Sequence, residues 1–260
     1  MIDFHIHSNT STDTKNEVGE IIRTAANKGL QHICITNHYE PLEVKKGFMK
    51  QSFSQEELQR CRDQIASVDY PGLEVSLGVE LSYTQAEEED IQKFLEKNEF
   101  DYVLGTIHYV SNMPISNWGN RGKFPPEAID EYFDSLKNAI KLEKFDMMAH
   151  LDIYKRCLEP YSLQELQNQW KEVAELLIKH NTGFEINTSR GFDEEGEFYP
   201  SRETVEFIIN CGVKKITIGS DSHTYDRIGE NYNMATQFLK SLGINEIYYF
   251  KERKSLTWKI

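Results

Sequence analysis

Short apolar runs alternate with longer amphipathic stretches along almost the whole chain, and this alternation constrains the fold more than any other feature. The runs are brief, rich in β-branched and aromatic residues, and bounded by polar residues or glycine, which is typical of strands. Seven runs cover Ile2–Ile6, His32–Thr36, Leu73–Leu81, Asp101–Ile107, Phe145–Ala149, Gly183–Asn187 and Lys215–Ser220, and an eighth candidate covers Glu246–Phe250. Strands that alternate with helices predict a parallel sheet.

The stretches between the runs carry helix start signals. Ser54 followed by Glu57 and Ser162 followed by Glu165 are capping-box patterns. The five predicted helices cover residues 18–30, 54–68, 126–141, 162–180 and 201–212, and the acidic run 87–90 predicts the first turn of another. Seven or eight strand–helix units in 260 residues favour a closed barrel over an open doubly wound sheet.

The eight histidines are distributed unevenly over this pattern. His32 opens a strand and His180 follows a helix, and we interpret both as structural residues. The other six lie at or just beyond the C-terminal end of a predicted strand, and they are His5, His7, His38, His108, His150 and His223. Because the C-terminal ends of all strands of a β/α barrel open onto one face, we expect these six to converge on one mouth.

Three carboxylates occupy the same kind of position. Glu80 ends the third strand, Asp221 forms a DxH pair with His223, and Asp13 lies in the first loop. Imidazole and carboxylate together suit zinc, manganese or iron. Nine converging donors exceed what one ion can use, so we expect two or three divalent metal ions, with Glu80 bridging a pair. Such pairs recur in phosphoester hydrolysis.

Six short motifs make the pattern more specific. They are HxH at His5–His7, TNH at Thr36–His38, GVE at Gly78–Glu80, TIH at Thr106–His108, AHLD at Ala149–Asp152 and SDSH at Ser220–His223. In this order they resemble the PHP superfamily, named after polymerase and histidinol phosphatase. The resemblance implies a single PHP domain over residues 1–260, of the α/β class. It implies a distorted seven-stranded (β/α)7 TIM-like barrel with a trinuclear metal centre at its C-terminal mouth.

The resemblance also implies how the donors divide among the metals. The first metal would be held by His5, His7, Glu80 and Asp221, the second by Glu80, His108 and His150, and the third by Asp13, His38 and His223. Many relatives have a histidine at the position of Asp13, whereas an aspartate there occurs in the histidinol-phosphatase branch. The complete donor set argues against a degenerate, metal-free relative.

The chain length and the long insertion after His108 look most like the monofunctional histidinol-phosphate phosphatases. The resemblance therefore implies hydrolysis of L-histidinol phosphate to L-histidinol and phosphate, a step of histidine biosynthesis, by attack of a hydroxide that bridges the first two metals. Glu80, Asp13 and His223 are the candidate catalytic residues. The proton for the leaving group could come from Asp13, from His223 or from a metal-bound water.

Cationic side chains near the mouth are candidates for binding the phosphate. Arg190 follows the sixth strand, Arg156 and Lys155 follow the AHLD motif, and Arg121 lies in the insertion after the TIH motif. Arginine suits bidentate contacts with phosphate. A solvated surface charge is the alternative at each position.

Other substrates stay open within the same superfamily, namely nucleotide or oligonucleotide phosphates and phosphotyrosine. A non-catalytic metal-binding or regulatory module is the alternative from a different class. The formal net charge of −13 disfavours broad nucleic-acid binding, which needs a basic surface. We therefore expect a small-molecule phosphate ester as the partner, with no stable nucleic-acid binding and no membrane.

The remaining features predict a cytoplasmic enzyme of open oligomeric state. No run approaches the ~20 apolar residues of a membrane span. The N-terminus lacks the basic start and apolar stretch of a signal peptide. The four cysteines lie far apart and form no CxxC pair, which disfavours a disulfide scaffold or a thiolate zinc site.

Overall fold

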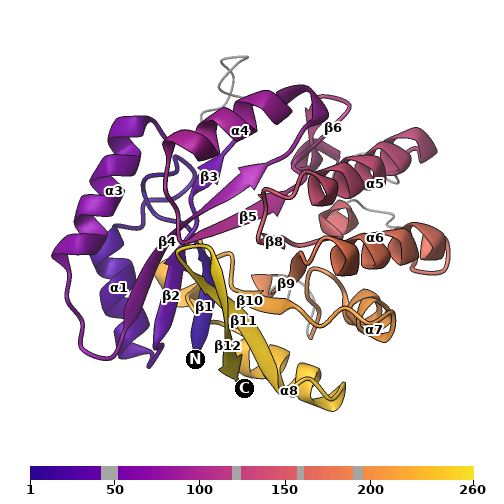
Figure 1. Ribbon diagram of the computed structural model, residues 1–260. Helices are drawn as coiled ribbons and strands as arrows, with labels where there is room; N and C mark the ends of the chain where they lie inside the picture. The colour runs from indigo at the N-terminus through magenta and orange to yellow at the C-terminus, as the bar shows by residue number, and fades with distance from the viewer. Residues whose placement is uncertain (42–51, 119–123, 157–160, 190–195) are drawn as a thin grey trace.

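The structure is a computed structural model that describes residues 1–41, 52–118, 124–156, 161–189 and 196–260. Parallel strands form a nearly closed barrel, and helices surround it (Figure 1). The barrel strands, in their order in the sheet, are β1 (Ile2–Ile6), β2 (His32–Ile35), β4 (Glu74–Ser82), β5 (Tyr102–Thr106), β8 (Met147–Met148), β9 (Gly183–Asn187) and β10 (Ile216–Gly219). The predicted seven-stranded barrel of the α/β class is confirmed.

The barrel closes between β10 and β1, just beyond the last residue of β10. Ser222 bridges Ile6 at this seam. The amide of His7 donates to the carbonyl of Ser222 at 3.0 Å, and the amide of Ser222 donates to the carbonyl of His5 at 3.3 Å. The seam therefore brings the segment after β10 against the C-terminal end of β1.

Amphipathic helices pack their apolar faces against the barrel. In the described part of the chain they are α1 (Val18–Asn27), α3 (Gln55–Ser67), α4 (Glu88–Lys97), α5 (Pro126–Lys141), α6 (Gln167–Lys179), α7 (Arg202–Asn210) and α8 (Tyr232–Ser241). All five predicted helices are present, and the acidic run 87–90 leads into α4 as expected. Helix α8 was not predicted.

The two capping boxes form, but they have different consequences. Ser54 Oγ accepts from the Glu57 amide at 3.2 Å, and Glu57 Oε2 accepts from the Ser54 amide at 2.6 Å, directly before α3. Ser162 and Glu165 make the same pair of hydrogen bonds at 3.3 and 2.8 Å. Residues 163–166 nevertheless form turns, so the expected start of α6 at residue 162 was wrong.

The eighth apolar run is a strand that lies outside the barrel. It forms β11 (Glu246–Lys251), which pairs antiparallel with β12 (Lys254–Lys259). Glu252 and Arg253 join the two strands with φ angles of 50° and 62°. This left-handed two-residue turn matches the twist of an antiparallel pair, and it makes the last strands a hairpin.

The hairpin lies across the barrel near the N-terminus (Figure 1). Phe250 stacks on Tyr102 with ring centroids 5.0 Å apart, and Tyr249 meets the ring of Phe4 edge-on at 5.9 Å. His32 is buried against Tyr249 at 5.1 Å. His32 and Tyr102 are the first residues of β2 and β5, so aromatic packing closes the N-terminal end of the barrel, which we call the base. The opposite end, the mouth, carries the strand C-termini.

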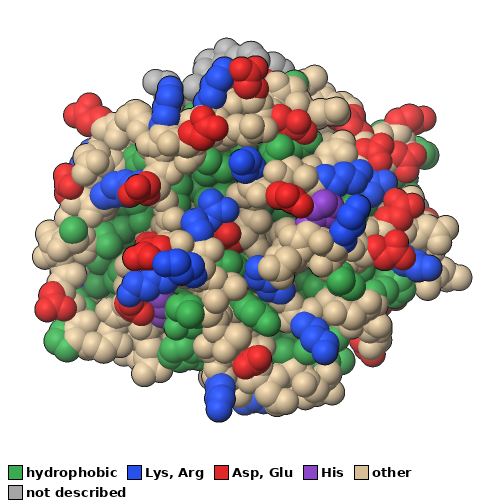
Figure 2. All heavy atoms as spheres, viewed as in Figure 1, with side chains coloured by type: hydrophobic (Ala, Val, Ile, Leu, Met, Phe, Trp, Pro, Cys, Tyr) green, Lys and Arg blue, Asp and Glu red, His purple; other side chains and the backbone are tan. Residues whose placement is uncertain are grey.

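The face that carries the hairpin has a mixed surface. Figure 2 shows lysine and arginine side chains interspersed with aspartate and glutamate, and no continuous basic strip is visible among the described residues on this face. Within the described ranges, no helix has both the length and the apolar character needed to cross a membrane.

Candidate metal centre

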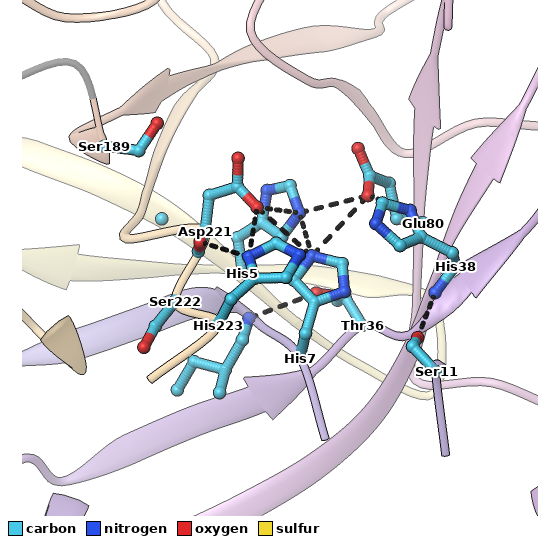
Figure 3. A network of polar contacts seen from close by, with 12 residues as sticks. His5, His7, Ser11, Thr36, His38, Glu80, Ser189, Asp221, Ser222 and His223 are labelled. Carbon is cyan, nitrogen blue, oxygen red and sulfur yellow. Dashed lines mark hydrogen bonds and ion pairs between the residues drawn. The ribbon is translucent and has the colours of Figure 1, made fainter. Parts of the chain in front are cut away.

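Nine ionisable side chains meet at the mouth of the barrel. They are the nine that the strand-end pattern brought forward, namely His5, His7, Asp13, His38, Glu80, His108, His150, Asp221 and His223. Figure 3 shows the imidazoles of His5, His7 and His223 close to the carboxylates of Glu80 and Asp221. The side chains of His5, His7 and Glu80 are fully buried. The inner part of the cluster therefore concentrates charge away from solvent.

His5, His7, Glu80 and Asp221 form the first donor set. The Nε2 atoms of His5 and His7 lie 3.0 Å apart. Their distances to Glu80 Oε2 are 3.4 and 3.6 Å, and their distances to Asp221 Oδ1 are 3.5 and 3.2 Å. A tetrahedral ion with bonds of ~2.0–2.1 Å separates its ligand atoms by about 3.3 Å. These five distances are close to those between the ligand atoms of a tetrahedral metal ion.

Glu80 directs its other oxygen toward a second donor set. Its Oε1 lies 2.9 Å from His150 Nε2 and 3.3 Å from His108 Nε2. One carboxylate oxygen therefore faces each set, which is the geometry of a ligand that bridges two ions.

Asp13 joins a third set at the rim. Its Oδ2 lies 2.8 Å from His223 Nε2 and 3.2 Å from His38 Nε2. The side chain of His223 is 35% exposed and that of Asp13 is 20% exposed. The third set is the one that solvent reaches most readily.

The residues fit a metal centre. Glu80 Oε2 is buried and accepts no hydrogen bond from the described residues, although imidazole nitrogens of His5, His7 and His38 lie within 3.6 Å. A buried carboxylate is costly unless positive charge or hydrogen bonds balance it. A divalent cation among these atoms would supply that charge, and imidazole with carboxylate suits zinc, manganese or iron.

Charge pairing holds the carboxylates of the cluster ionised. Burial raises the pKa of the Glu80 carboxyl, but His38, His5 and His108 together hold it well below its usual range. Burial lowers the pKa of His108, but Glu40 and Glu80 outweigh burial and raise it to about 9. Protons on imidazoles thus balance the carboxylates, and a cation that binds here must displace such protons.

His7 is the exception among these imidazoles. Burial, together with the neighbouring charges of His223 and His38, lowers the pKa of His7 to about 3. Its ring is therefore neutral near pH 7 and can bind a metal without first losing a proton.

Sequence reasoning missed two buried carboxylates next to the cluster. Glu185 Oε1 lies 2.7 Å from His5 Nδ1, and Glu40 Oε1 lies 2.5 Å from His108 Nδ1. Each contact turns the Nε2 atom of its histidine toward the donor set, which is how carboxylates orient metal-binding histidines. The available signals were a charge inside the apolar run 183–187 and an acid two residues beyond the TNH motif.

A known protein-family model matches the part of the chain that carries most of the nine side chains. The PHP domain model matches residues 3–189, which contain all of the nine side chains except Asp221 and His223. The chain belongs to the PHP domain family. In this PHP domain the two remaining side chains come from the segment after β10, which the barrel seam places beside β1.

The PHP chain matches curated relatives over nearly their whole length. It is 29% identical over 241 residues to the "Probable histidinol-phosphatase" of Thermotoga maritima, which covers 92% of this chain and 91% of the relative. It is 25% identical over 269 residues to the histidinol-phosphatase of Lactococcus lactis subsp. lactis, covering 97% and 95%. It shares its fold with the crystal structure of histidinol phosphate phosphatase from Lactococcus lactis subsp. lactis complexed with zinc, L-histidinol and phosphate. The TM-score is 0.84 at 24% identity and 98% coverage of both chains.

The mouth of the PHP domain opens into a cavity of about 380 Å³, a size that suits a small molecule. Three short 3₁₀ helices contribute to its wall, namely η2 (Ile115–Trp118), η3 (Ile153–Arg156) and η5 (Tyr225–Arg227). Apart from the cluster, the wall consists of Tyr109, Pro114, Ile115, Ser116, Ile153, Arg156, Ser189 and Arg227. The cavity therefore offers apolar surface, hydroxyls and two guanidinium groups above the donor sets.

The predicted phosphate-binding residues have different placements. Arg156 lines the cavity and is exposed. Lys155 differs from the expectation, because its Nζ lies 3.0 Å from Asp152 Oδ2 and 2.6 Å from Ser201 Oγ and the residue does not line the cavity. Arg190 and Arg121 lie outside the described residues.

Arg227 also lines the cavity, and sequence reasoning did not propose it. It lies four residues beyond His223, in η5. Its position soon after the SDSH motif was the signal that could have identified it.

Proposed function

We propose that this protein is a metal-dependent phosphatase that hydrolyses L-histidinol phosphate to L-histidinol and phosphate. The observation that carries the proposal is the Glu80 carboxylate, which lies between two donor sets at a cavity also lined by Arg156 and Arg227. The relatives named histidinol-phosphatase match nearly the full length of the chain, which supports the choice of substrate.

We propose two or three divalent ions, zinc, manganese or iron, as the cofactors. The proposed ligands are His5, His7, Glu80 and Asp221 for the first, Glu80, His108 and His150 for the second, and Asp13, His38 and His223 for the third. When bound, such ions neutralise the phosphoryl oxygens and lower the pKa of water, so that a nucleophile exists near neutral pH. Glu80 holds the first two donor sets at a fixed separation.

The arginines and the third donor set have distinct proposed roles. Arg156 and Arg227 bind the non-reacting phosphate oxygens, because guanidinium groups bind phosphate with paired, charge-assisted hydrogen bonds. Asp13 and His223 lie at the exposed edge of the cluster, where the leaving alkoxide receives its proton.

The rest of the cavity suits the leaving group. Tyr109, Ile115 and Ile153 provide apolar contacts for an imidazole ring, and Ser116 and Ser189 provide hydroxyls for its polar atoms. We propose a small-molecule phosphate ester as the only substrate class, bound by a single PHP domain that spans residues 1–260.

The test is kcat/KM for L-histidinol phosphate against a panel of phosphoesters on zinc- or manganese-reconstituted protein. The panel contains a nucleoside bisphosphate, a phosphotyrosine peptide and an aryl phosphate. We expect a preference of at least ~100-fold for L-histidinol phosphate, since the cavity selects the leaving group. A flat profile or a preference for the nucleotide would contradict the proposal that L-histidinol phosphate is the substrate. Hydrolysis of none of these by fully metal-loaded protein would favour a non-catalytic metal-binding module.

A further inference from the structure

Strand β9 carries a carboxylate into the floor beneath the first donor set. Glu185 is fully buried in an otherwise mostly apolar strand. A buried carboxylate is stable only when it accepts hydrogen bonds. Glu185 Oε1 lies 2.7 Å from His5 Nδ1, and its Oε2 accepts from the backbone amide of His150 at 3.2 Å.

Asn187 extends this contact to a third proposed ligand. It lies two residues beyond Glu185 in β9, and side chains two apart in a strand share one face. Its Nδ2 lies 3.2 Å from Glu185 Oε2 and 3.2 Å from Asp221 Oδ2. The two side chains thus contact proposed ligands that come from three different places, namely β1, the end of β8 and the end of β10.

Two of these three ligands have strained backbones. The φ angle of His150 is 23° and that of Asp221 is 52°. Residues with a Cβ hold such left-handed conformations only when their surroundings impose them. Glu185 accepts from the amide of His150, and Asn187 donates to the side chain of Asp221. Glu185 and Asn187, which we call the β9 pair, therefore contact both of the strained residues.

Glu185 and His5 pack directly against the backbone of the neighbouring strand β10. A Cβ added to Gly219 would lie 2.2 Å from Glu185 Oε1 and 2.4 Å from His5 Cβ. Strand β10 thus has to carry glycine opposite the contact between Glu185 and His5.

We propose that Glu185 and Asn187 are positioning residues that set the geometry of the first donor set through the side chains of His5 and Asp221, and that the affinity for the first metal depends on them. Their contact with His150, a proposed ligand of the second set, is made only through its backbone amide. The inference rests on the metal centre of the proposed function, but not on its substrate. Glu40 provides a contrast, because its described contact with the second set is confined to His108.

Glu185→Gln is the sharpest test, because it keeps the shape and removes one acceptor. Glu185 faces three donors, whereas glutamine has one acceptor oxygen and one amide NH₂ group. If the NH₂ group faces His5 Nδ1, the ring must carry its proton on Nε2, where the metal should bind. If the oxygen faces His5, the NH₂ group meets the donors of His150 and Asn187. Asn187→Asp is the second variant, since it replaces the shared donor with an acceptor between two carboxylates.

The readout is zinc stoichiometry and zinc affinity, measured by competition with a chromogenic chelator, together with the thermal unfolding of the metal-free protein. We expect both variants to bind one zinc ion ~10–100-fold more weakly than the wild type, with little change in metal-free Tm. Glu40→Gln is the matched control and should weaken a different ion, so that the Glu40→Gln/Glu185→Gln double variant shows both losses.

Wild-type zinc affinity in Glu185→Gln and Asn187→Asp would overturn the positioning role. A lowered metal-free Tm with wild-type affinity would overturn it as well, since the pair would then only stabilise the fold. Failure of the wild-type protein to bind zinc, manganese or iron would instead remove the proposed metal centre, and the inference with it.

Discussion

The two ends of the barrel are both well packed, but they bury different chemistry. The mouth holds nine ionisable side chains whose contacts are mainly with one another. The base is sealed by stacked aromatic rings such as Tyr102 and Phe250. This division is typical of β/α barrels, in which the C-terminal face carries the chemistry and the N-terminal face carries stability.

The two ends also have opposite effects on the pKa of a buried histidine. At the mouth, Glu40 and Glu80 outweigh the effect of burial and raise the pKa of His108 to about 9. At the base, burial lowers the pKa of His32 to about 4, because Glu74 offsets only part of that effect. His108 is therefore protonated and can exchange its proton for a metal cation, whereas His32 is kept neutral. Substitutions at the two ends should accordingly change different quantities.

The substitution that should cost the most activity lies at the mouth. Glu80→Ala removes the carboxylate shared by two donor sets, and we expect kcat/KM to fall by ~10³-fold or more, because metal ions contribute several kcal/mol to such reactions. The fold should survive, since no strand or base contact is lost. The measurement is hydrolysis of L-histidinol phosphate together with metal content and far-UV circular dichroism. Normal turnover by metal-replete Glu80→Ala protein would contradict the proposed metal centre.

A substitution at the base should instead lower stability. Phe250→Ala removes a ring that is 1% exposed and stacks on Tyr102. We expect the free energy of unfolding to fall by about 3–4 kcal/mol, measured by urea denaturation, with kcat/KM unchanged below the transition. Leu256→Ala in the same hairpin is the control, because Leu256 is 41% exposed and should cost less than ~0.5 kcal/mol. A loss of activity without a loss of stability would contradict the division between the ends.

A third substitution, at the mouth, should weaken the binding of the substrate phosphate. Arg156→Ala removes a guanidinium from the cavity wall, and we expect kcat/KM for L-histidinol phosphate to fall by ~10–100-fold, or about 1.4–2.7 kcal/mol. Arg23→Ala is the matched control, because Arg23 lies on α1, pairs with Glu20 and does not line the cavity. Equal activity of the two variants would remove Arg156 from the substrate site.

Much of the mouth was predictable from the sequence, for a physical reason. Parallel strands in a barrel direct their C-terminal ends to one face, so residues such as His5 and His223 were expected to meet although 218 positions separate them along the chain. The strands themselves followed from short apolar runs. The eighth run was recognised as a strand, but its place was not, because it depends on the turn at Glu252 and Arg253 rather than on the run.

The residues that sequence reasoning missed or misplaced depend on contacts between distant segments. Glu185 faces His5 across 180 positions, and nothing local to β9 indicates which histidine it orients. Lys155 was expected at the phosphate, but Ser201 and Asp152 hold its ammonium group elsewhere. A pattern indicates which face of the barrel a residue reaches, whereas its partner there follows only from the packed structure.

The smallest change we expect is in how stability at the base depends on pH. His32 has a pKa of about 4 in the folded protein against about 6.5 in an unfolded chain, so the unfolded state binds more protons between these values and stability falls as the pH drops from 7 to 5. In His32→Gln this contribution is absent. We expect the wild type to lose on the order of 1–2 kcal/mol more than the variant over that interval, measured by urea denaturation in a chelator so that the mouth contributes equally to both. The two stability curves should run parallel between pH 7 and 8, where His32 is neutral in both states. Parallel curves down to pH 5 would mean that the base does not hold its histidine neutral, and that the two ends differ in packing but not in their treatment of charge.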